Sequence, residues 1–146
     1  MAKEIDFPPV WLAGFAAIGG LVGRFVPVQL GFNSIFGAVL ILLGLAVMLV
    51  AAVQMMLART TVIPHRDPSA LVMNGMFALS RNPIYLGDAL VLTGLYLHWD
   101  ALLALPLVFL FMIVITRRFI RPEEARLEGA FGEVFQEYRA RTRRWI

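Results

Sequence analysis

The sequence predicts an all-α, polytopic membrane protein with about four transmembrane helices and a C-terminal cytoplasmic amphipathic helix. Apolar residues make up 60% of the 146 positions and the mean hydropathy is +0.77, which is far from the composition of a water-soluble domain. Four long apolar runs are present, and the alternating pattern of membrane barrel strands is not. Because this length holds about four spans of ~20 residues, we expect one membrane-embedded domain over residues 1–146.

The four apolar runs occupy residues 10–30, 35–58, 84–99 and 101–116. The first two are long enough to cross a bilayer as helices. The last two have 16 residues each, about 24 Å of helix, so they require a thin bilayer or a continuation beyond its core. Small residues in the first two runs would let helices approach closely.

Positive charge is concentrated beside particular spans. Of the 13 Lys and Arg residues, 8 lie between Arg117 and Arg144, and the 59–83 loop carries three more, whereas the other two connections carry none. This asymmetry predicts that both termini are cytoplasmic, and we expect an integral protein of a prokaryotic inner membrane. The basic excess therefore indicates contact with membrane lipids, and we expect no nucleic-acid partner. Cysteine is absent and no metal-ligand spacing is present, so we expect no metal site.

Polar residues gather where the third span begins, in the segment SRNPIYLGDA (residues 80–89). Asn82 is a typical N-cap residue and Pro83 is typical of the first position of a helix, so a helix is predicted to begin here. The free backbone N–H groups of such a helix start attract a carboxylate or phosphate. Arg81 could add charge or could serve only as an anchor at the membrane border. Asp88 lies within the span, where an ionisable group is costly, so we expect it to have a function.

A second polar segment follows the fourth span. A predicted helix begins near Pro122, and its apolar residues recur on one face: Leu127, Phe131, Val134, Phe135 and Tyr138. Two glutamates in its first turn, at 123 and 124, could accept hydrogen bonds from a ligand or could simply suit the helix dipole. Both polar segments are predicted to face the same aqueous side, which makes a site between them geometrically natural.

The two segments LVMNGMFALSRNPIYLG (71–87) and EEARLEGAFGEVFQEYRAR (123–141) together resemble the isoprenylcysteine carboxyl methyltransferase and phospholipid methyltransferase family. The first matches the family motif at Leu71, Val72, Gly75, Phe77, Arg81, Asn82, Pro83, Tyr85 and Gly87. The second matches at Glu123, Glu124, Leu127, Phe131, Gly132, Phe135 and Tyr138. The resemblance covers roughly residues 60–142, and the first two spans match only as generic membrane helices.

This resemblance implies an integral membrane methyltransferase that uses S-adenosyl-L-methionine, bound by segments 64–88 and 117–142. The implied cofactor-binding residues are Leu71, Val72, Gly75, Phe77, Asn82, Pro83, Ile84, Tyr85 and Glu123. The implied acceptor is lipophilic and enters from the bilayer. An isoprenylcysteine-like carboxylate would need an orienting arginine, with Arg117, Arg118 and Arg121 as candidates and Arg81 as a less favoured one. A phospholipid amine would need a carboxylate to take its proton, for which Asp88 and Glu124 are candidates.

The acceptor stays open at this point. Asn82 stands where the eukaryotic carboxyl methyltransferases have histidine, and Phe119 aligns with their substrate-orienting arginine. A small-thiol S-methyltransferase of the same family is an alternative. A small four-helix proton-coupled transporter that uses Asp88 is an alternative of another class. The oligomeric state is not determined by the sequence.

Overall fold

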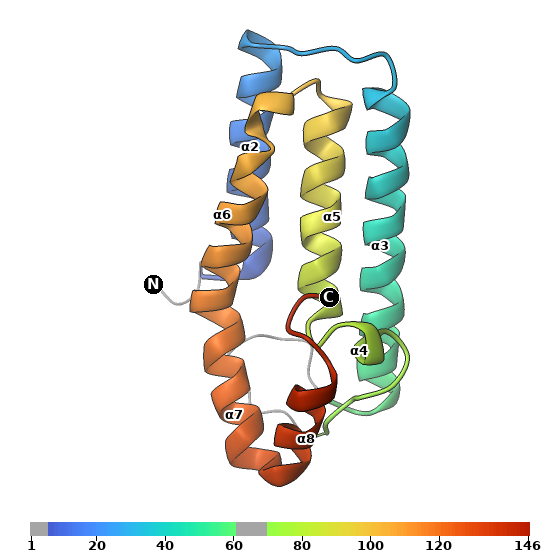
Figure 1. Cartoon of the computed structure of the whole chain (residues 1–146), viewed down its shortest axis with the longest axis vertical. Coiled ribbons are helices and arrows are strands. Elements are labelled where there is room, and N and C mark those ends of the chain that lie inside the picture. The colour runs from blue at the N-terminus through green and yellow to red at the C-terminus, as the bar shows by residue number, and fades with distance from the viewer. Residues whose placement is uncertain (1–5, 61–69) are drawn as a thin grey trace.

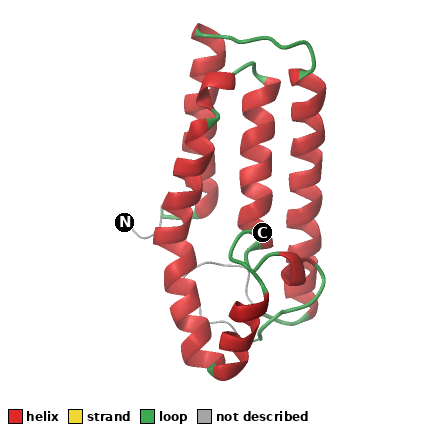
Figure 2. Cartoon of the chain, viewed as in Figure 1, coloured by secondary structure: helices red, strands yellow, loops and turns green. Residues whose placement is uncertain are grey.

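The computed structural model describes residues 6–60 and 70–146, and within these ranges the regular structure is entirely helical (Figure 2). The first predicted cofactor-binding segment begins at residue 64, so its residues 64–69 lie outside the described ranges. The α-helices are α2 (Pro8–Phe25), α3 (Asn33–Leu57), α4 (Met76–Leu79), α5 (Pro83–His98), α6 (Pro106–Ile115), α7 (Arg121–Phe131) and α8 (Glu133–Arg141). A 3₁₀ turn, Leu102–Ala104, precedes α6, and a π-helical segment, Thr116–Ile120, joins α6 to α7.

Helices α2, α3, α5 and α6 run side by side, and α4, α7 and α8 gather at one end of this bundle (Figure 1). The α2–α3 and α5–α6 connections meet at the opposite end. There the backbone N–H of Val28 donates to the Asp100 carbonyl at 2.9 Å, and Ser34 Oγ lies 3.2 Å from His98 Nδ1. The two polar segments are therefore at the same end of the bundle, as their order between the spans predicts.

Helices α3 and α5 pack backbone against backbone at two matched pairs of glycines. A Cβ on Gly44 would stand 2.7 Å from the Gly87 carbonyl oxygen, and a Cβ on Gly94 would stand 2.6 Å from that of Gly37. The glycines are seven residues apart on each of the two antiparallel helices, so the close contacts repeat after two turns. Gly87 in the first motif is thus required for this contact between helices.

A second core holds α2 and α6 against α5. The hydroxyl of Tyr96 is buried and donates to the Phe15 carbonyl at 2.8 Å, which satisfies its hydrogen bond inside the bundle. Phe15 also meets Phe111 of α6 edge to face, with ring centroids 5.5 Å apart. Phe119, at the position where the sequence alignment expected an arginine, is buried in the same cluster.

Within residues 6–60 and 70–146, two helices are long and apolar enough to cross a membrane: α3, and the continuous helix from Leu102 to Phe131. The first apolar run is helical only as far as Phe25, and its last residues, 26–30, form an irregular connection. The third begins at Pro83 and ends at His98, close to its predicted bounds. That all four runs cross the bilayer stays a prediction.

The C-terminal region differs from the single amphipathic helix that the sequence pattern predicts. Helix α7 continues directly from α6 through the π-helical segment, and Pro122 is accommodated in the first turn after it. The helix then ends at Gly132, whose φ of +55° is a left-handed conformation that glycine adopts readily. Helix α8 starts there in a new direction. Four residues of the predicted apolar face, Leu127, Phe131, Phe135 and Tyr138, pack in one cluster across both helices. The fifth, Val134, is exposed, because the break at Gly132 separates α8 from the periodicity of α7.

Candidate functional site

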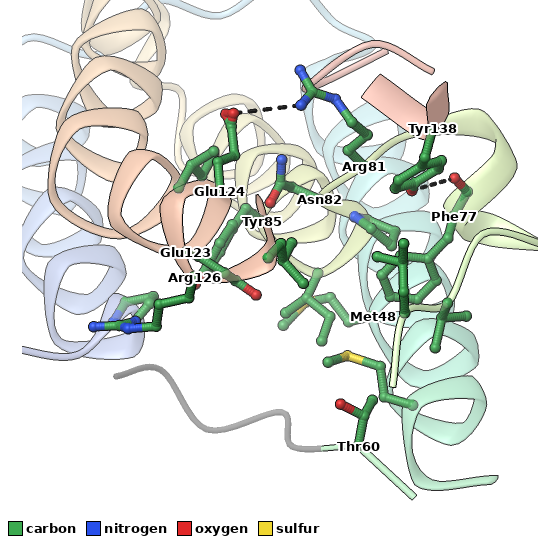
Figure 3. Close-up of a pocket in the computed structure, with 18 of the residues that line it drawn as sticks. Met48, Thr60, Phe77, Arg81, Asn82, Tyr85, Glu123, Glu124, Arg126 and Tyr138 are labelled. Atoms are coloured by element: carbon green, nitrogen blue, oxygen red, sulfur yellow. Dashed lines mark hydrogen bonds and ion pairs between the residues drawn. The ribbon is translucent and has the colours of Figure 1, made fainter. Parts of the chain in front are cut away.

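A cavity of about 340 Å³ opens at the end of the bundle where α4, α7 and α8 gather (Figure 3). Its volume is in the range of small-molecule sites, which run from roughly 300 to 1,000 Å³. Eight of the nine predicted cofactor-binding residues line it: Leu71, Val72, Phe77, Asn82, Pro83, Ile84, Tyr85 and Glu123. Three of the six predicted catalytic residues also line it: Arg81, Asp88 and Glu124. The structure therefore brings the two sequence segments together around one space.

The two segments are also joined directly. The buried Tyr138 hydroxyl of α8 donates to the Phe77 carbonyl of α4 at 2.6 Å (Figure 3). Phe135 packs against Tyr138 edge to face, with ring centroids 6.5 Å apart, and both belong to a cluster with Ala51 of α3. Phe135 and Tyr138 of the second segment thus hold α8 against α4 of the first segment.

Pro83 occupies the first position of α5, as predicted, but the Asn82 side chain does not cap the helix. Its amide instead donates to the Arg144 carbonyl at 2.9 Å. Ser80 is fully buried next to it, donates to the same carbonyl at 3.3 Å and accepts from the Asn82 N–H at 3.1 Å. The backbone N–H groups of the first turn of α5 therefore lie beside the cavity without a side-chain cap from Asn82.

Glu124 is held by two arginines from different parts of the chain. Arg144 Nε lies 2.7 Å from its Oε1, and Arg81 Nη1 lies 3.4 Å from its Oε2. These contacts connect α7 to the start of α5 and to the C-terminal tail. Arg81 keeps one buried donor, Nε, that has no hydrogen-bond partner among the described residues. Burial lowers the pKa of Arg81, against the opposing effect of Glu124, and an arginine nevertheless stays charged.

Glu123 differs from its neighbour. It faces the cavity half-buried, and no hydrogen bond or ion pair joins it to the described residues (Figure 3). Burial raises the pKa of its carboxyl to about 7; nearby Arg126 counteracts this and Glu124 adds to it. Glu123 is therefore the cavity acid that is available to a ligand at the helix α7 wall.

Asp88 lies one and a half turns into α5 and is 3% exposed. It lines the cavity, and within the described part of the chain it has neither a hydrogen bond nor an ion pair. Two acids of the cavity, Asp88 on α5 and Glu123 on α7, thus have no hydrogen bond or ion pair with the described residues.

Four predicted site residues do not line the cavity. Gly75 has a φ of +59°, and the Gln54 side chain packs against its α carbon while accepting from Met76 N–H at 3.0 Å, so its position indicates a structural role. Arg118 makes a two-oxygen contact with Asp6, with its closest distance 2.9 Å, and lies over the Trp11 ring. Arg117 and Arg121 are exposed. Their predicted role toward an acceptor stays a prediction.

Several lining residues were not predicted from the sequence. Met48 and Met55 of α3 form one wall, and Phe7 to Pro9 contribute another part. Arg126 also lines the cavity, and its position three residues after Glu123 is a signal that helical spacing could have supplied. The sequence predicts contact with membrane lipids for the basic excess, which includes Arg144, yet the Arg144 backbone and guanidinium both contact the site.

The arrangement agrees with a comparison to known protein families. The family model described as phospholipid methyltransferase matches residues 32–134. Neither the curated proteins nor the solved structures gave a significant match. The matched range begins at the start of α3, so it extends further toward the N-terminus than the two sequence motifs, and it includes the helix that forms the methionine wall of the cavity. It covers well over half of the chain, and the protein therefore belongs to the phospholipid methyltransferase family.

Proposed function

We propose that this membrane methyltransferase uses S-adenosyl-L-methionine to methylate a lipophilic acceptor that enters from the bilayer. The observation that carries the proposal is the cavity of about 340 Å³ that both motif segments line, at the end of the bundle where apolar helices give way to charged ones. Phospholipid methyltransferases generally use this cofactor. Under the predicted orientation the cavity opens at the cytoplasmic face.

The residues present fit the cofactor. The buried Arg81 Nε donor and the start of α5 suit its carboxylate, because both offer N–H groups to an anion. Glu123 suits ribose hydroxyls or the amino group. The aromatic residues Phe77 and Tyr85 suit the adenine ring or the sulfonium charge.

When bound, the cofactor supplies a methyl group activated by a positively charged sulfur. The protein then has to hold the acceptor atom in line with that carbon and to exclude water. No covalent intermediate with the protein is needed. The apolar wall of Met48, Met55 and Leu71 suits this task because it presents few hydrogen-bonding groups to water.

A direct binding measurement tests the proposal. Isothermal titration calorimetry of the purified protein with S-adenosylhomocysteine should show saturable binding. Glu123→Ala should weaken that binding by about tenfold or more, since a charge-assisted hydrogen bond is worth roughly 1.5–3 kcal/mol. Glu137→Ala is the matched control, because Glu137 is exposed on α8 and does not line the cavity. Absence of binding by the unaltered protein at high micromolar ligand would refute the proposal and would favour the transporter alternative.

A further inference from the structure

The C-terminal tail, residues 142–146, contacts the site from outside the cavity. Arg144 Nε and Nη2 bind the two carboxylate oxygens of Glu124 at 2.7 and 3.2 Å. The indole N–H of Trp145 donates to the Thr116 hydroxyl at 3.2 Å, which attaches the tail to the π-helical segment. Glu124 lines the cavity, whereas residues 142–146, all of them within the described part of the chain, do not. The tail therefore acts on a ligand in the cavity through the residues that it contacts.

Glu124 has two arginine partners, and they hold it unequally. Arg144 contacts both oxygens, whereas Arg81 reaches only Oε2, through Nη1 at 3.4 Å (Figure 3). The Nε donor of Arg81 has no hydrogen-bond partner among the described residues. An arginine that meets a carboxylate alone commonly binds it through two parallel N–H groups. Arg144 therefore occupies the carboxylate that Arg81 would otherwise bind in this way.

These three side chains keep a surplus of positive charge. Two guanidinium groups face one carboxylate, so one positive charge is not neutralised within the group. The side chains of Arg81 and Glu124 are only 9% and 11% exposed, so water screens this charge poorly. A buried charge is stabilised by an opposite charge beside it. An anionic part of the ligand is therefore expected next to Arg81, which lines the cavity.

We propose that Arg144 is a positioning residue of the cofactor site: by occupying Glu124, it keeps Arg81 available to the carboxylate at the methionine end of S-adenosyl-L-methionine. This inference rests on the methyltransferase function proposed above. Without the Arg144 side chain, Arg81 is the remaining partner of Glu124 and turns to form a two-oxygen ion pair with it. That pair is neutral, so the cavity loses the charge that faces the carboxylate. The nucleoside end of the cofactor does not depend on this charge.

Arg139 of α8 provides a matched control for this role. Burial is the main cause that lowers the pKa of Arg81; Glu124 opposes it, and the charges of Arg144 and Arg139 add to it, so both arginines act on Arg81. Arg139 is exposed and, within the described residues, forms no ion pair with Glu124. Substituting Arg139 therefore removes a nearby positive charge but leaves Glu124 occupied by Arg144.

Calorimetry with two ligands tests the proposal. S-adenosylhomocysteine has the amino-acid end, and 5′-methylthioadenosine has the same nucleoside without it. Arg144→Met should weaken the binding of S-adenosylhomocysteine by about tenfold or more, because the carboxylate loses a charged hydrogen-bond partner. Its dissociation constant for 5′-methylthioadenosine should stay within about twofold of the unaltered value, as should both constants in Arg139→Met. An Arg144→Met protein that binds both ligands as before, or both equally weakly, would overturn the proposal.

A second substitution separates this role from a structural one. Arg144→Met combined with Glu124→Gln removes the carboxylate that captures Arg81, so the affinity for S-adenosylhomocysteine should return to within about twofold of the unaltered value. A structural role predicts no recovery, because the ion pair is absent in the double variant as well, and that result would overturn the proposal. If the unaltered protein binds the two ligands equally tightly, the role of Arg144 is refuted alone. If it binds neither ligand, the methyltransferase proposal is refuted.

Discussion

The packing of α3 on α5 and the contacts that surround the cavity are of different kinds. Between α3 and α5, glycines bring one backbone directly against another, so no side chain separates Gly44 from Gly87. Around the cavity, Glu124 forms ion pairs with Arg81 and Arg144, which are distant in the sequence. The Arg144 carbonyl also accepts hydrogen bonds from Ser80 and Asn82, just before α5.

The rigid packing of the bundle and the groups available for chemistry are therefore in different contacts. A backbone contact has no spare volume, so the packing of α3 on α5 tolerates little change, and backbone polar groups in a helix are hydrogen-bonded within that helix. Ion pairs and tail hydrogen bonds enclose a space without filling it. Buried charged side chains therefore lie around the cavity, where a ligand of opposite charge can pair with them. The rest of the bundle holds these side chains in place.

The largest effect should come from adding volume to the glycine contact. Gly44→Leu would force its side chain against the Gly87 carbonyl, which cannot move aside as a flexible side chain does. We expect a loss of about 3 kcal/mol or more, seen as early thermal aggregation in detergent. Gly14→Ala is the control, because a Cβ there meets no atom within 4 Å, and it should stabilise helix α2 by about 0.5–1 kcal/mol. A melting curve of Gly44→Leu that matches the unaltered protein would contradict this description of the bundle.

The next largest effect should come from separating the tail from the site. Arg144→Met removes the 2.7 Å contact and leaves Glu124 with only the longer contact to Arg81. We expect a loss of about 1.5–3 kcal/mol, because a partly buried carboxylate loses a charged hydrogen-bond donor. A double-mutant cycle with Glu124→Gln should give a coupling energy of about 0.5–3 kcal/mol. If the losses in free energy of unfolding from the two substitutions simply add, the Arg144–Glu124 ion pair does not hold the C-terminal tail against the site.

The affinity for S-adenosylhomocysteine should depend on pH through Glu123. Burial raises its pKa to about 7, so the carboxyl is ionised above that pH and neutral below it. Since the ionised form is the stronger acceptor for ligand hydroxyl or ammonium groups, the affinity should fall as pH decreases, by roughly tenfold between pH 8 and pH 6. Glu123→Gln should bind more weakly and lose this dependence in calorimetry. The same slope in both proteins would assign the titration to another group.

The smallest effect should come from the ion pair between Arg118 and Asp6. The Arg118 side chain is 48% exposed, so water competes for both charges even though the geometry is good. We expect Arg118→Gln to melt at a temperature indistinguishable from that of the unaltered protein in physiological salt. A clear drop in the melting temperature would mean that the start of the chain, which lines the cavity at Phe7 to Pro9, depends on this pair.

The sequence was sufficient to predict the helical class, the family and the meeting of the two motif segments, because residue order alone places both segments at one end of the spans. It could not predict that Met48 lines the cavity, since a helix that is apolar on all sides carries no signal for the face it presents. It also could not predict the role of the tail. The contact between Asn82 and the Arg144 carbonyl joins residues 62 positions apart, and a backbone carbonyl has no residue type by which to recognise it.

The unequal lengths of the helices have a consequence for the surrounding membrane. Helix α3 has 25 residues, about 37 Å, whereas α5 has 16, about 24 Å, against a hydrocarbon thickness of about 30 Å. Under the four-span arrangement that we predict, the lipids beside α5 must shorten or tilt to match it. The bilayer surface would then dip beside α5, whose first residues line the cavity, so an acceptor that enters from the bilayer, as proposed, would reach the cavity through locally thinned membrane.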